Sequence, residues 1–341
     1  MNSNSSVSNL ASTILYYDFL FFASIKECGT QDGISYVKLY NGDILFGYSK
    51  DGGYYQPIFE KYADDFAKLN LTQDGYPAAF DALISYHYEN AAPILKTNFL
   101  PYSGTVLDIG CRACHFAVKA SHIADKIFCI DPTDFSEKYF NLHISNNSLN
   151  NCQFIKQAVS EKCEVKRFFS GSAGGSFSGF IESTKNKSGD IVVSTDMHKI
   201  KKEILTTTVD DLVNEYQIAS IDMIILQING YEYNALIGAM NTLKNIPPSI
   251  IFVTTFQNDR HSTTPQRGKI FNLLDSIGYT PIIRTETVDV YSHAKGTKIT
   301  GVYNYAVDTA TTAICDYSKR EENNIFFNMA QKLRTKLRYW K

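Results

Sequence analysis

Short apolar runs alternate with segments of helical spacing from about residue 105 onward. The runs at 106–109, 126–130, 223–228 and 249–253 are rich in Val, Ile and Leu, as strands covered on both faces of a sheet are. A shorter strand is predicted at 153–155, and helices are predicted at 115–124, 136–147, 208–216, 231–243 and 269–277. Strands and helices in this order predict an α/β fold with a doubly wound, mostly parallel sheet.

Residues 1–100 follow a different pattern, which predicts an α+β cap at the N-terminus. Alternating runs at 34–40 and 43–48 flank Asn41-Gly42, a pair typical of tight hairpin turns. Helical spacing follows at 59–69 and 90–96. We therefore predict three regions: a cap of a hairpin plus helices at 1–100, an α/β domain at 101–310, and a basic, helical C-terminal tail at 311–341.

Two segments interrupt the alternation of strands and helices. The segment 161–206 is rich in Gly and Ser, and it predicts a mobile loop followed by an added strand near 190–194. The segment 257–267 is polar and loop-like and follows a predicted strand. Both segments are expected to border the ligand cleft.

Composition and charge narrow the class of protein. The chain has 341 residues, 44% of them hydrophobic and 20% charged, which indicates a folded protein. A formal net charge of −2 gives no general reason to expect a nucleic-acid partner. Seven widely spread cysteines do not form a disulfide framework, which favours a cytoplasmic location.

The sequence near the two ends of the chain does not predict a membrane span. The apolar run at 14–25 is too short to span, and no basic residue precedes it, so a buried helix or a partner surface is favoured. The tail at 331–341 mixes Lys and Arg with Leu and Trp, a composition compatible with peripheral contact to an anionic membrane. A solvated helix is the favoured interpretation of this tail.

The predicted sheet places several polar residues in one cleft, because ligands of such sheets bind outside the carboxyl ends of the strands. Gly110 follows the first strand, and Asp131 follows the next, about 20 residues later, where a carboxylate can accept hydrogen bonds from ribose hydroxyls. The spacing therefore predicts a ligand that carries adenosine. The predicted cofactor-binding residues are Asp108, Gly110, Cys111, Asp131, Gln157, Ala158 and Ser160.

The adenosine could belong to a nicotinamide cofactor or to S-adenosylmethionine. A nicotinamide site needs further glycines for the approach of a pyrophosphate, but Arg112 and Cys114 occupy positions where glycine would help. S-adenosylmethionine has no pyrophosphate and tolerates such a turn. The pattern favours a methyltransferase over a nicotinamide-dependent oxidoreductase, which remains an alternative.

Five segments between about 85 and 285 together resemble the FkbM-type methyltransferases, a class I family with a Rossmann-like sheet. The segments are Val106-Leu107-Asp108-Ile109-Gly110, Ile130-Asp131-Pro132, Gln157-Ala158-Val159-Ser160-Glu161, Thr208-Val209-Asp210-Asp211-Leu212 and Asp222 to Glu232. The resemblance implies S-adenosylmethionine as cofactor and methyl transfer to an oxygen atom. It implies as acceptor a hydroxyl of a glycan or related small molecule.

The chain departs from the family pattern after its fourth strand. Ile225 replaces a lysine, Gln227 an aspartate and Asn229 a glutamate, while Asp222 and Glu232 are kept. Amides in place of acids cannot act as bases, so Gln227 and Asn229 are expected to orient substrate. The lost charges motivate a second hypothesis, a non-catalytic binding module with a methyltransferase fold.

A hydroxyl acceptor often needs a general base, and three residues are candidates. Glu232 is one, although an acid in the first turn of a helix also suits the helix dipole. His115 and His198 are the others, and His261 is a more distant possibility.

Cys111 and Cys114 form a Cys-x-x-Cys pair at the start of a predicted helix. Such a pair could serve redox chemistry or bind zinc. A thioredoxin-type redox pair would need a different strand order, and no second Cys-x-x-Cys exists to complete a zinc site. A plain helix start is therefore favoured, and no metal is expected.

Overall fold

The computed structural model describes part of the chain, and its contacts divide into two units. The described residues are 24–47, 60, 63–64, 67, 71–75, 78–79, 103–170, 179–180, 184–185, 191–192, 200–254, 266–284 and 288–295. The first unit comprises 1–98, 142–148 and 302–341, and the second comprises 99–141 and 149–301. The predicted helix at 90–96 and the tail at 331–341 lie outside the described residues.

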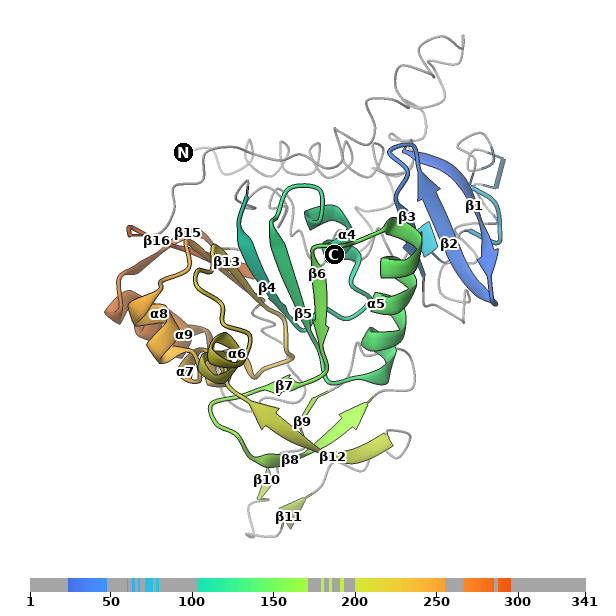
Figure 1. Ribbon diagram of the computed structural model, residues 1–341. Coiled ribbons are helices and arrows are strands. Elements are labelled where there is room, and N and C mark those ends of the chain that lie inside the picture. Colours follow the sequence, from blue (N-terminus) through green and yellow to red (C-terminus); the bar gives the residue numbers. More distant parts are fainter. Residues whose placement is uncertain are drawn as a thin grey trace, which may run out of the picture. The chain divides into compact units, whose positions relative to one another are not determined.

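The first unit contains a three-stranded antiparallel sheet of β1 (Ile25–Gln31), β2 (Ile34–Leu39) and β3 (Ile44–Phe46) (Figure 1). The predicted hairpin at Asn41-Gly42 is confirmed, because β2 pairs antiparallel with β3. Strand β1 was not predicted. Its turn to β2 is Asp32-Gly33, and both residues have positive φ (52° and 74°), which is the conformation that an Asp-Gly hairpin turn requires.

The second unit is built on a seven-stranded sheet with the order β15-β16-β14-β13-β4-β5-β6. Five strands are parallel neighbours: β4 (Thr105–Ile109), β5 (Lys126–Ile130), β6 (Cys152–Ile155), β13 (Met223–Leu226) and β14 (Ile250–Thr254). The predicted α/β fold with a mostly parallel, Rossmann-like sheet is thus confirmed.

Two antiparallel strands at one edge of this sheet were not predicted. They are β15 (Tyr279–Arg284) and β16 (Val288–His293), and β16 pairs with β14. Every second residue of β15 is exposed from Thr280 to Arg284, so this edge strand lacks the continuous apolar run that marks the central strands.

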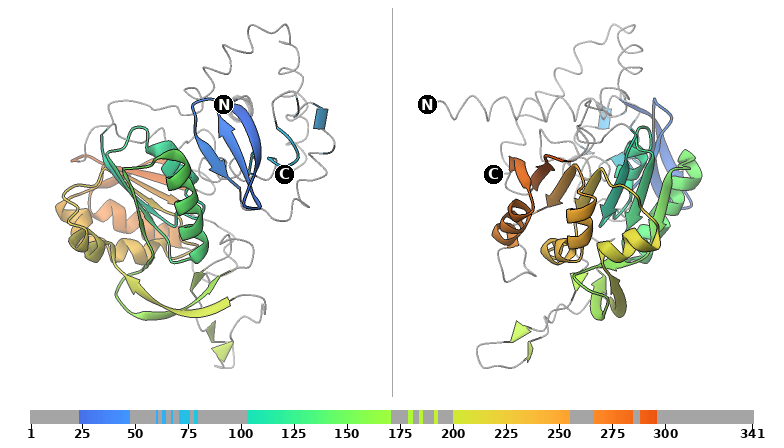
Figure 2. Two further views of the ribbon diagram at one scale, coloured as in Figure 1. Left: turned by 45° about the vertical axis from the view of Figure 1, so that its right-hand side comes forward. Right: turned by 60° about the vertical axis from the view of Figure 1, so that its left-hand side comes forward.

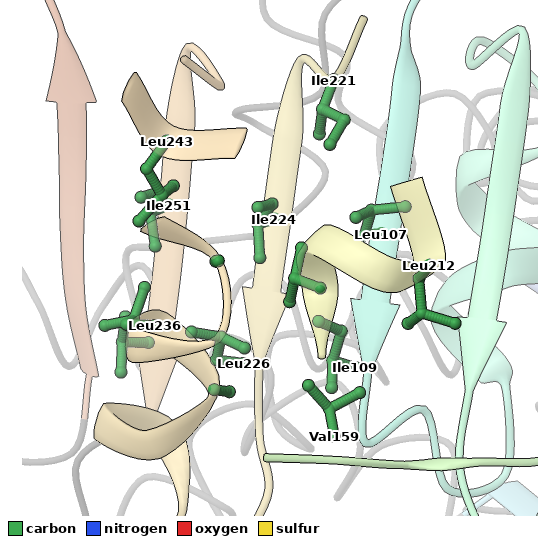
Figure 3. Packing of buried hydrophobic residues seen from close by; sticks show 14 of the residues in the cluster. Leu107, Ile109, Val159, Leu212, Ile221, Ile224, Leu226, Leu236, Leu243 and Ile251 are labelled. Carbon is green, nitrogen blue, oxygen red and sulfur yellow. The ribbon is translucent and has the colours of Figure 1, made fainter. Parts of the chain in front are cut away.

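Helices cover both faces of the sheet (Figure 2). One face carries α6 (Val209–Glu215), α7 (Glu232–Ile237), α8 (Met240–Asn245) and α9 (Gln266–Ser276). Their Leu212, Leu236 and Leu243 pack against Leu107, Ile224 and Ile251 of the strands, as Figure 3 shows. The other face carries α4 (His115–Ala120) and α5 (Asp134–Asn147), where Phe140 of α5 contacts Phe154 of β6.

The single helix predicted at 231–243 is wrong, because the chain breaks it into α7 and α8 at Gly238. A Cβ atom at this position would lie 2.3 Å from the carbonyl oxygen of Ser160. The close approach of these two segments therefore needs glycine, and the tight turn ends the helix. The helix predicted at 115–124 is also shorter, since α4 ends at Ala120.

The predicted loop with one added strand at 161–206 is wrong. A four-stranded sheet occupies much of this segment, with β7 (Ala158–Val159), β12 (Ile200–Thr207), β8 (Val165–Ser170) and β9 (Gly179–Phe180) in that order. A separate pair forms between β10 (Thr184–Lys185) and β11 (Ile191–Val192). Charged residues interrupt β8 at Lys166-Arg167 and β12 at 201–203. Val165 and Leu205 are 63% exposed, so neither strand shows a buried apolar run.

Within the described part of the chain, no helix has the length and apolar character needed to cross a membrane.

Candidate functional site

The glycine turn after β4 touches the loop after β13. Gly110 has φ +88°, and its N–H donates to the carbonyl oxygen of Ile130 at 2.8 Å. A Cβ atom at Gly110 would lie 2.1 Å from the carbonyl oxygen of Gln227. Only glycine fits both the backbone angle and this contact. The structure therefore brings the ends of β4, β5 and β13 together, as the sequence predicts.

Asp131 stands at the end of β5 in a fixed orientation. Its Oδ1 accepts hydrogen bonds from the N–H and the hydroxyl of Thr133, at 2.9 and 2.6 Å. Burial raises the pKa of Asp131, and the hydrogen bonds from Thr133 only partly offset this rise. The side chain is half-buried, so a carboxylate held in place meets the surface at the predicted ribose position.

Gln157 follows β6 and carries a buried acceptor that lacks a donor. Among the described residues, no group donates a hydrogen bond to its Oε1. A buried polar atom in this state costs free energy, which a ligand with an N–H or O–H group would recover. Ala158 is the next residue in the chain; it lies in β7 and is buried.

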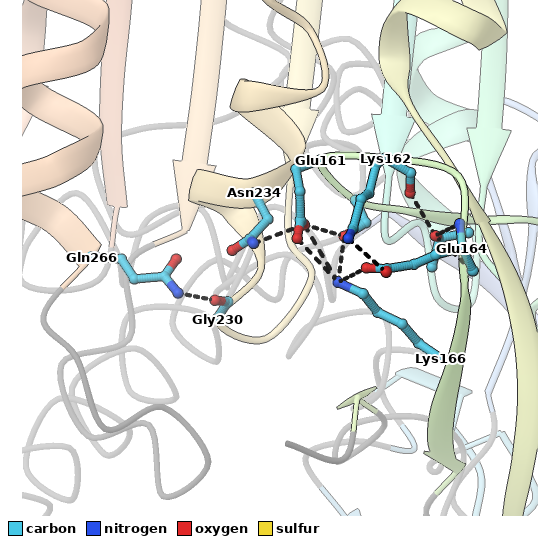
Figure 4. Close-up of polar contacts among 9 residues, drawn as sticks. Glu161, Lys162, Glu164, Lys166, Gly230, Asn234 and Gln266 are labelled. Atoms are coloured by element: carbon cyan, nitrogen blue, oxygen red, sulfur yellow. Dashed lines mark hydrogen bonds and ion pairs between the residues drawn. The ribbon is translucent and has the colours of Figure 1, made fainter. Parts of the chain in front are cut away.

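Ser160 belongs to a polar network around Glu161. Figure 4 shows Glu161, Lys166 and Asn234 of this network. The Ser160 hydroxyl donates to Glu161 at 2.5 Å and accepts from Lys166 Nζ at 2.9 Å. Asn234 of α7 also donates to Glu161, at 2.8 Å. Burial alone would raise the pKa of Glu161, but the hydrogen bonds from Ser160 and Asn234 and the charge of Lys166 lower it to about 2.

Glu232 holds the loop after β13. Its two carboxylate oxygens accept the N–H groups of Ile228 and Gly230, each at 2.9 Å, and the side chain is buried. Asn229 and Gly230 have φ of +53° and +96°, so the loop is a tight turn that these bonds stabilise. Gln266 of α9 also donates to the Gly230 carbonyl (Figure 4). The geometry gives the Glu232 carboxylate a positioning role.

The remaining site predictions fall at different places. Gln227 and Asn229 are half-buried in the loop after β13. Gln227 lies next to the Gly110 turn. His115, the first residue of α4, is almost fully buried, as is Asp108. His198 and His261 lie outside the described residues.

Three further acids of the resembling segments have structural partners. Asp222 accepts the N–H of Thr105 at 2.9 Å, which ties β13 to the first residue of β4, at the end of the strand away from Gly110. Asp211 donates its N–H to the N-cap hydroxyl of Thr208 at 3.0 Å. Asp210 accepts the N–H of Thr242 in α8 at 2.8 Å. These acids stabilise helix starts and strand ends.

A third cysteine joins the Cys-x-x-Cys pair. The Sγ atoms of Cys111, Cys114 and Cys129 all lie within 4.8 Å of one another, and all three side chains are buried. Burial raises the pKa values of Cys111 and Cys114, while hydrogen bonds from those two thiols lower the pKa of Cys129 to about 5. Sequence spacing did not link Cys129 to the pair, because strand pairing alone brings β5 beside the turn.

A sequence comparison matches one segment of the chain to a known family. Residues 120–281, just under half of the chain, match the model of the methyltransferase FkbM domain. This segment is an FkbM-type methyltransferase domain. The FkbM match includes Asp131, Gln157, Gln227 and Glu232, and it begins after the Gly110 turn. The comparison with curated proteins finds no match.

Solved structures that are similar to this chain include three methyltransferases. A methyltransferase FkbM from Methylobacillus flagellatus is 14% identical, with a TM-score of 0.38; the match covers 72% of this chain and 60% of that protein. A Streptococcus mutans protein in complex with SAH is 10% identical, with 61% and 95% covered and a TM-score of 0.35. A SAM-dependent methyltransferase from Aquifex aeolicus is 13% identical, with 61% and 92% covered and a TM-score of 0.33. At these TM-scores the family assignment rests on the sequence match.

Proposed function

We propose that this protein is an S-adenosylmethionine-dependent methyltransferase whose cofactor site is formed by Gly110, Asp131 and Gln157. The observation that supports it most is the buried Gln157 Oε1, for which no described group is a donor. An adenosine ligand carries an amino group that could donate to this oxygen and ribose hydroxyls that could donate to Asp131. The residues present therefore fit this cofactor.

Each cofactor residue has a distinct part in this proposal. Asp131, held by Thr133, accepts hydrogen bonds from the ribose. Gly110 leaves the turn after β4 free of a side chain, so that the ligand can approach the backbone. When bound, S-adenosylmethionine supplies a methyl group on a sulfonium. The protein then mainly has to align the acceptor with that group.

We further propose that the acceptor is a hydroxyl of a glycan or related small molecule, as the resemblance implies. Gln227 and Asn229 orient this hydroxyl, since amides donate and accept hydrogen bonds without changing charge. His115 and His198 remain proposed bases. Glu232 supports the loop that carries Gln227 and Asn229, because its carboxylate accepts two backbone N–H groups of that loop.

Calorimetry with S-adenosylhomocysteine tests the cofactor site. The native protein should bind, and Asp131→Asn should weaken binding at least ~10-fold, because hydrogen bonds to a charged group contribute about 1.5–3 kcal/mol. Asp134→Asn is the matched control, since Asp134 begins α5 three residues later and is 79% exposed. Equal affinity in native and Asp131→Asn proteins would contradict the site. NADH should not bind in a parallel titration.

Three observations favour a second candidate function, a binding module without catalysis. Ile225 is buried in β13, Gln227 and Asn229 are amides, and the Glu232 carboxylate is engaged by the loop. Transfer of a labelled methyl group to a panel of hydroxylated acceptors separates the two functions. Cofactor binding without transfer to any acceptor would favour the binding module.

A further inference from the structure

The thiols of Cys111, Cys114 and Cys129 form a compact buried cluster, here called the three-cysteine cluster. Cys111 lies in the turn after β4, Cys114 directly precedes α4, and Cys129 is in β5. The Sγ atoms of Cys111 and Cys114 are 3.5 Å apart, and no two of the three are more than 4.8 Å apart. Cys114 and Cys129 are fully buried, and Cys111 is 6% exposed.

The fold gathers these thiols through two separate features. The Cys-x-x-Cys turn is closed by a hydrogen bond from the Cys114 N–H to the Cys111 carbonyl at 2.8 Å. Cys129 pairs in register with Asp108 of β4, the strand that leads into this turn. The turn and the pairing of β4 with β5 thus place the three thiols together on the sheet face that α4 covers.

We propose that the three-cysteine cluster binds a thiophilic metal ion, with Zn²⁺ as the resident ion. Thiolates are the preferred ligands of such ions. A Zn–S bond of about 2.3 Å places tetrahedrally arranged sulfur atoms about 3.8 Å apart. The spacing in the cluster lies close to this value, so binding needs only small side-chain adjustments.

Charge favours Zn²⁺ over Cu⁺ in this buried position. Three thiolates with Zn²⁺ carry a net charge of −1, whereas the same thiolates with Cu⁺ carry −2. An uncompensated buried charge is costly, and Asp108 pairs directly with Cys129 on the same sheet face. A site with three protein ligands leaves one coordination position for water.

The metal site and the proposed function can be tested separately, although both involve the turn after β4 and Cys111 is also a predicted cofactor-binding residue. Gly110 serves the cofactor proposal through its backbone, while the metal is held by the thiols of residues 111, 114 and 129. Metal content and S-adenosylhomocysteine affinity are separate measurements, so either proposal can fail while the other stands.

The experiment measures the metal content of the full chain by mass spectrometry after purification without an affinity tag that binds metal. The native protein should contain about one Zn²⁺ per chain. Co²⁺ exchanged into the site should give thiolate-to-cobalt charge-transfer absorption. Cys129→Ser should lower Zn²⁺ affinity at least ~100-fold, since even supporting residues change metal affinity 10–100-fold.

Cys152→Ser is the matched control, because Cys152 lies in the neighbouring strand β6 but outside the cluster, and it should retain the zinc. Circular dichroism checks the fold of each variant, and Cys114→Ser provides a second test if Cys129→Ser does not fold. Absence of metal together with no Co²⁺ absorption would overturn the proposal. So would a disulfide between Cys111 and Cys114, found by counting free thiols in the denatured protein, or copper in place of zinc.

Discussion

At the residue scale, Glu232 shows how one carboxylate can fix a loop. Glu232→Gln replaces one of the two acceptor oxygens with an NH₂ group, which cannot accept the N–H of Ile228 or Gly230. A buried N–H then lacks its partner, so the free energy of unfolding should fall by about 1–3 kcal/mol. Urea denaturation measures this, with the exposed Glu203→Gln as control. Unchanged stability with abolished methyl transfer would instead assign the carboxylate to catalysis.

Glu161 gives a prediction about pH. Its pKa in the folded protein is about 2, below the ordinary 4.5, because the hydrogen bonds from Ser160 and Asn234 outweigh the effect of burial. A lowered acid pKa stabilises the fold above about pH 4.5, and this contribution is lost as the pH falls toward about 2. The free-energy difference between the native protein and Glu161→Gln should therefore shrink across this range.

Denaturant unfolding of both proteins between about pH 6 and about pH 2.5 checks this sign. Because Glu161 is partly exposed and the Lys166 pair is 3.4 Å long, the difference at neutral pH should be only about 1 kcal/mol. If the difference in unfolding free energy stayed constant or grew on acidification, ionised Glu161 would not stabilise the fold through its network.

At the element scale, the turn between β4 and α4 depends on one glycine. Gly110→Ala places a Cβ 2.1 Å from the Gln227 carbonyl oxygen at a φ of +88°. The protein should lose at least ~2 kcal/mol of stability, since strained backbone and a displaced strand end both contribute. S-adenosylhomocysteine binding should weaken as well. Thermal melts and calorimetry measure the two effects.

Gly268 provides the matched control for this glycine. It lies in α9 and is exposed, and a Cβ atom added there would meet no described atom within 4 Å. Gly268→Ala should raise stability by about 0.5–1 kcal/mol, because alanine loses less backbone entropy in a helix. Equal effects of the two substitutions would contradict the packing argument for Gly110.

At the scale of the second unit, stability should be graded from the central strands outward. All residues of β13 and β14 are buried, and both strands have parallel or antiparallel partners on each side. In β8 and β12, by contrast, Val165 and Leu205 are exposed. Amide exchange followed by mass spectrometry should therefore be slowest in β13 and β14 and clearly faster in β8 and β12. Uniform exchange rates across the unit would contradict this gradient.

The sequence by itself determined the central parallel strands, the Asn41-Gly42 hairpin and the turn at Gly110. Each of these depends on a local signal: a continuous apolar run, a turn dipeptide, or a glycine after a strand. The same local signal placed Asp131 and Gln157 at strand ends, where the structure has them. Their binding of a cofactor stays a prediction.

Only the tertiary structure decided the features that depend on residues distant in sequence. The break at Gly238 follows from its contact with Ser160, and the engagement of Glu232 follows from the fold of its loop. The strands β8 and β12 form because they pair with each other, although their own patterns are polar. Cys129 joins Cys111 and Cys114 through the pairing of β4 with β5. Sequence periodicity reports which face of an element is buried, but not which distant group it meets there.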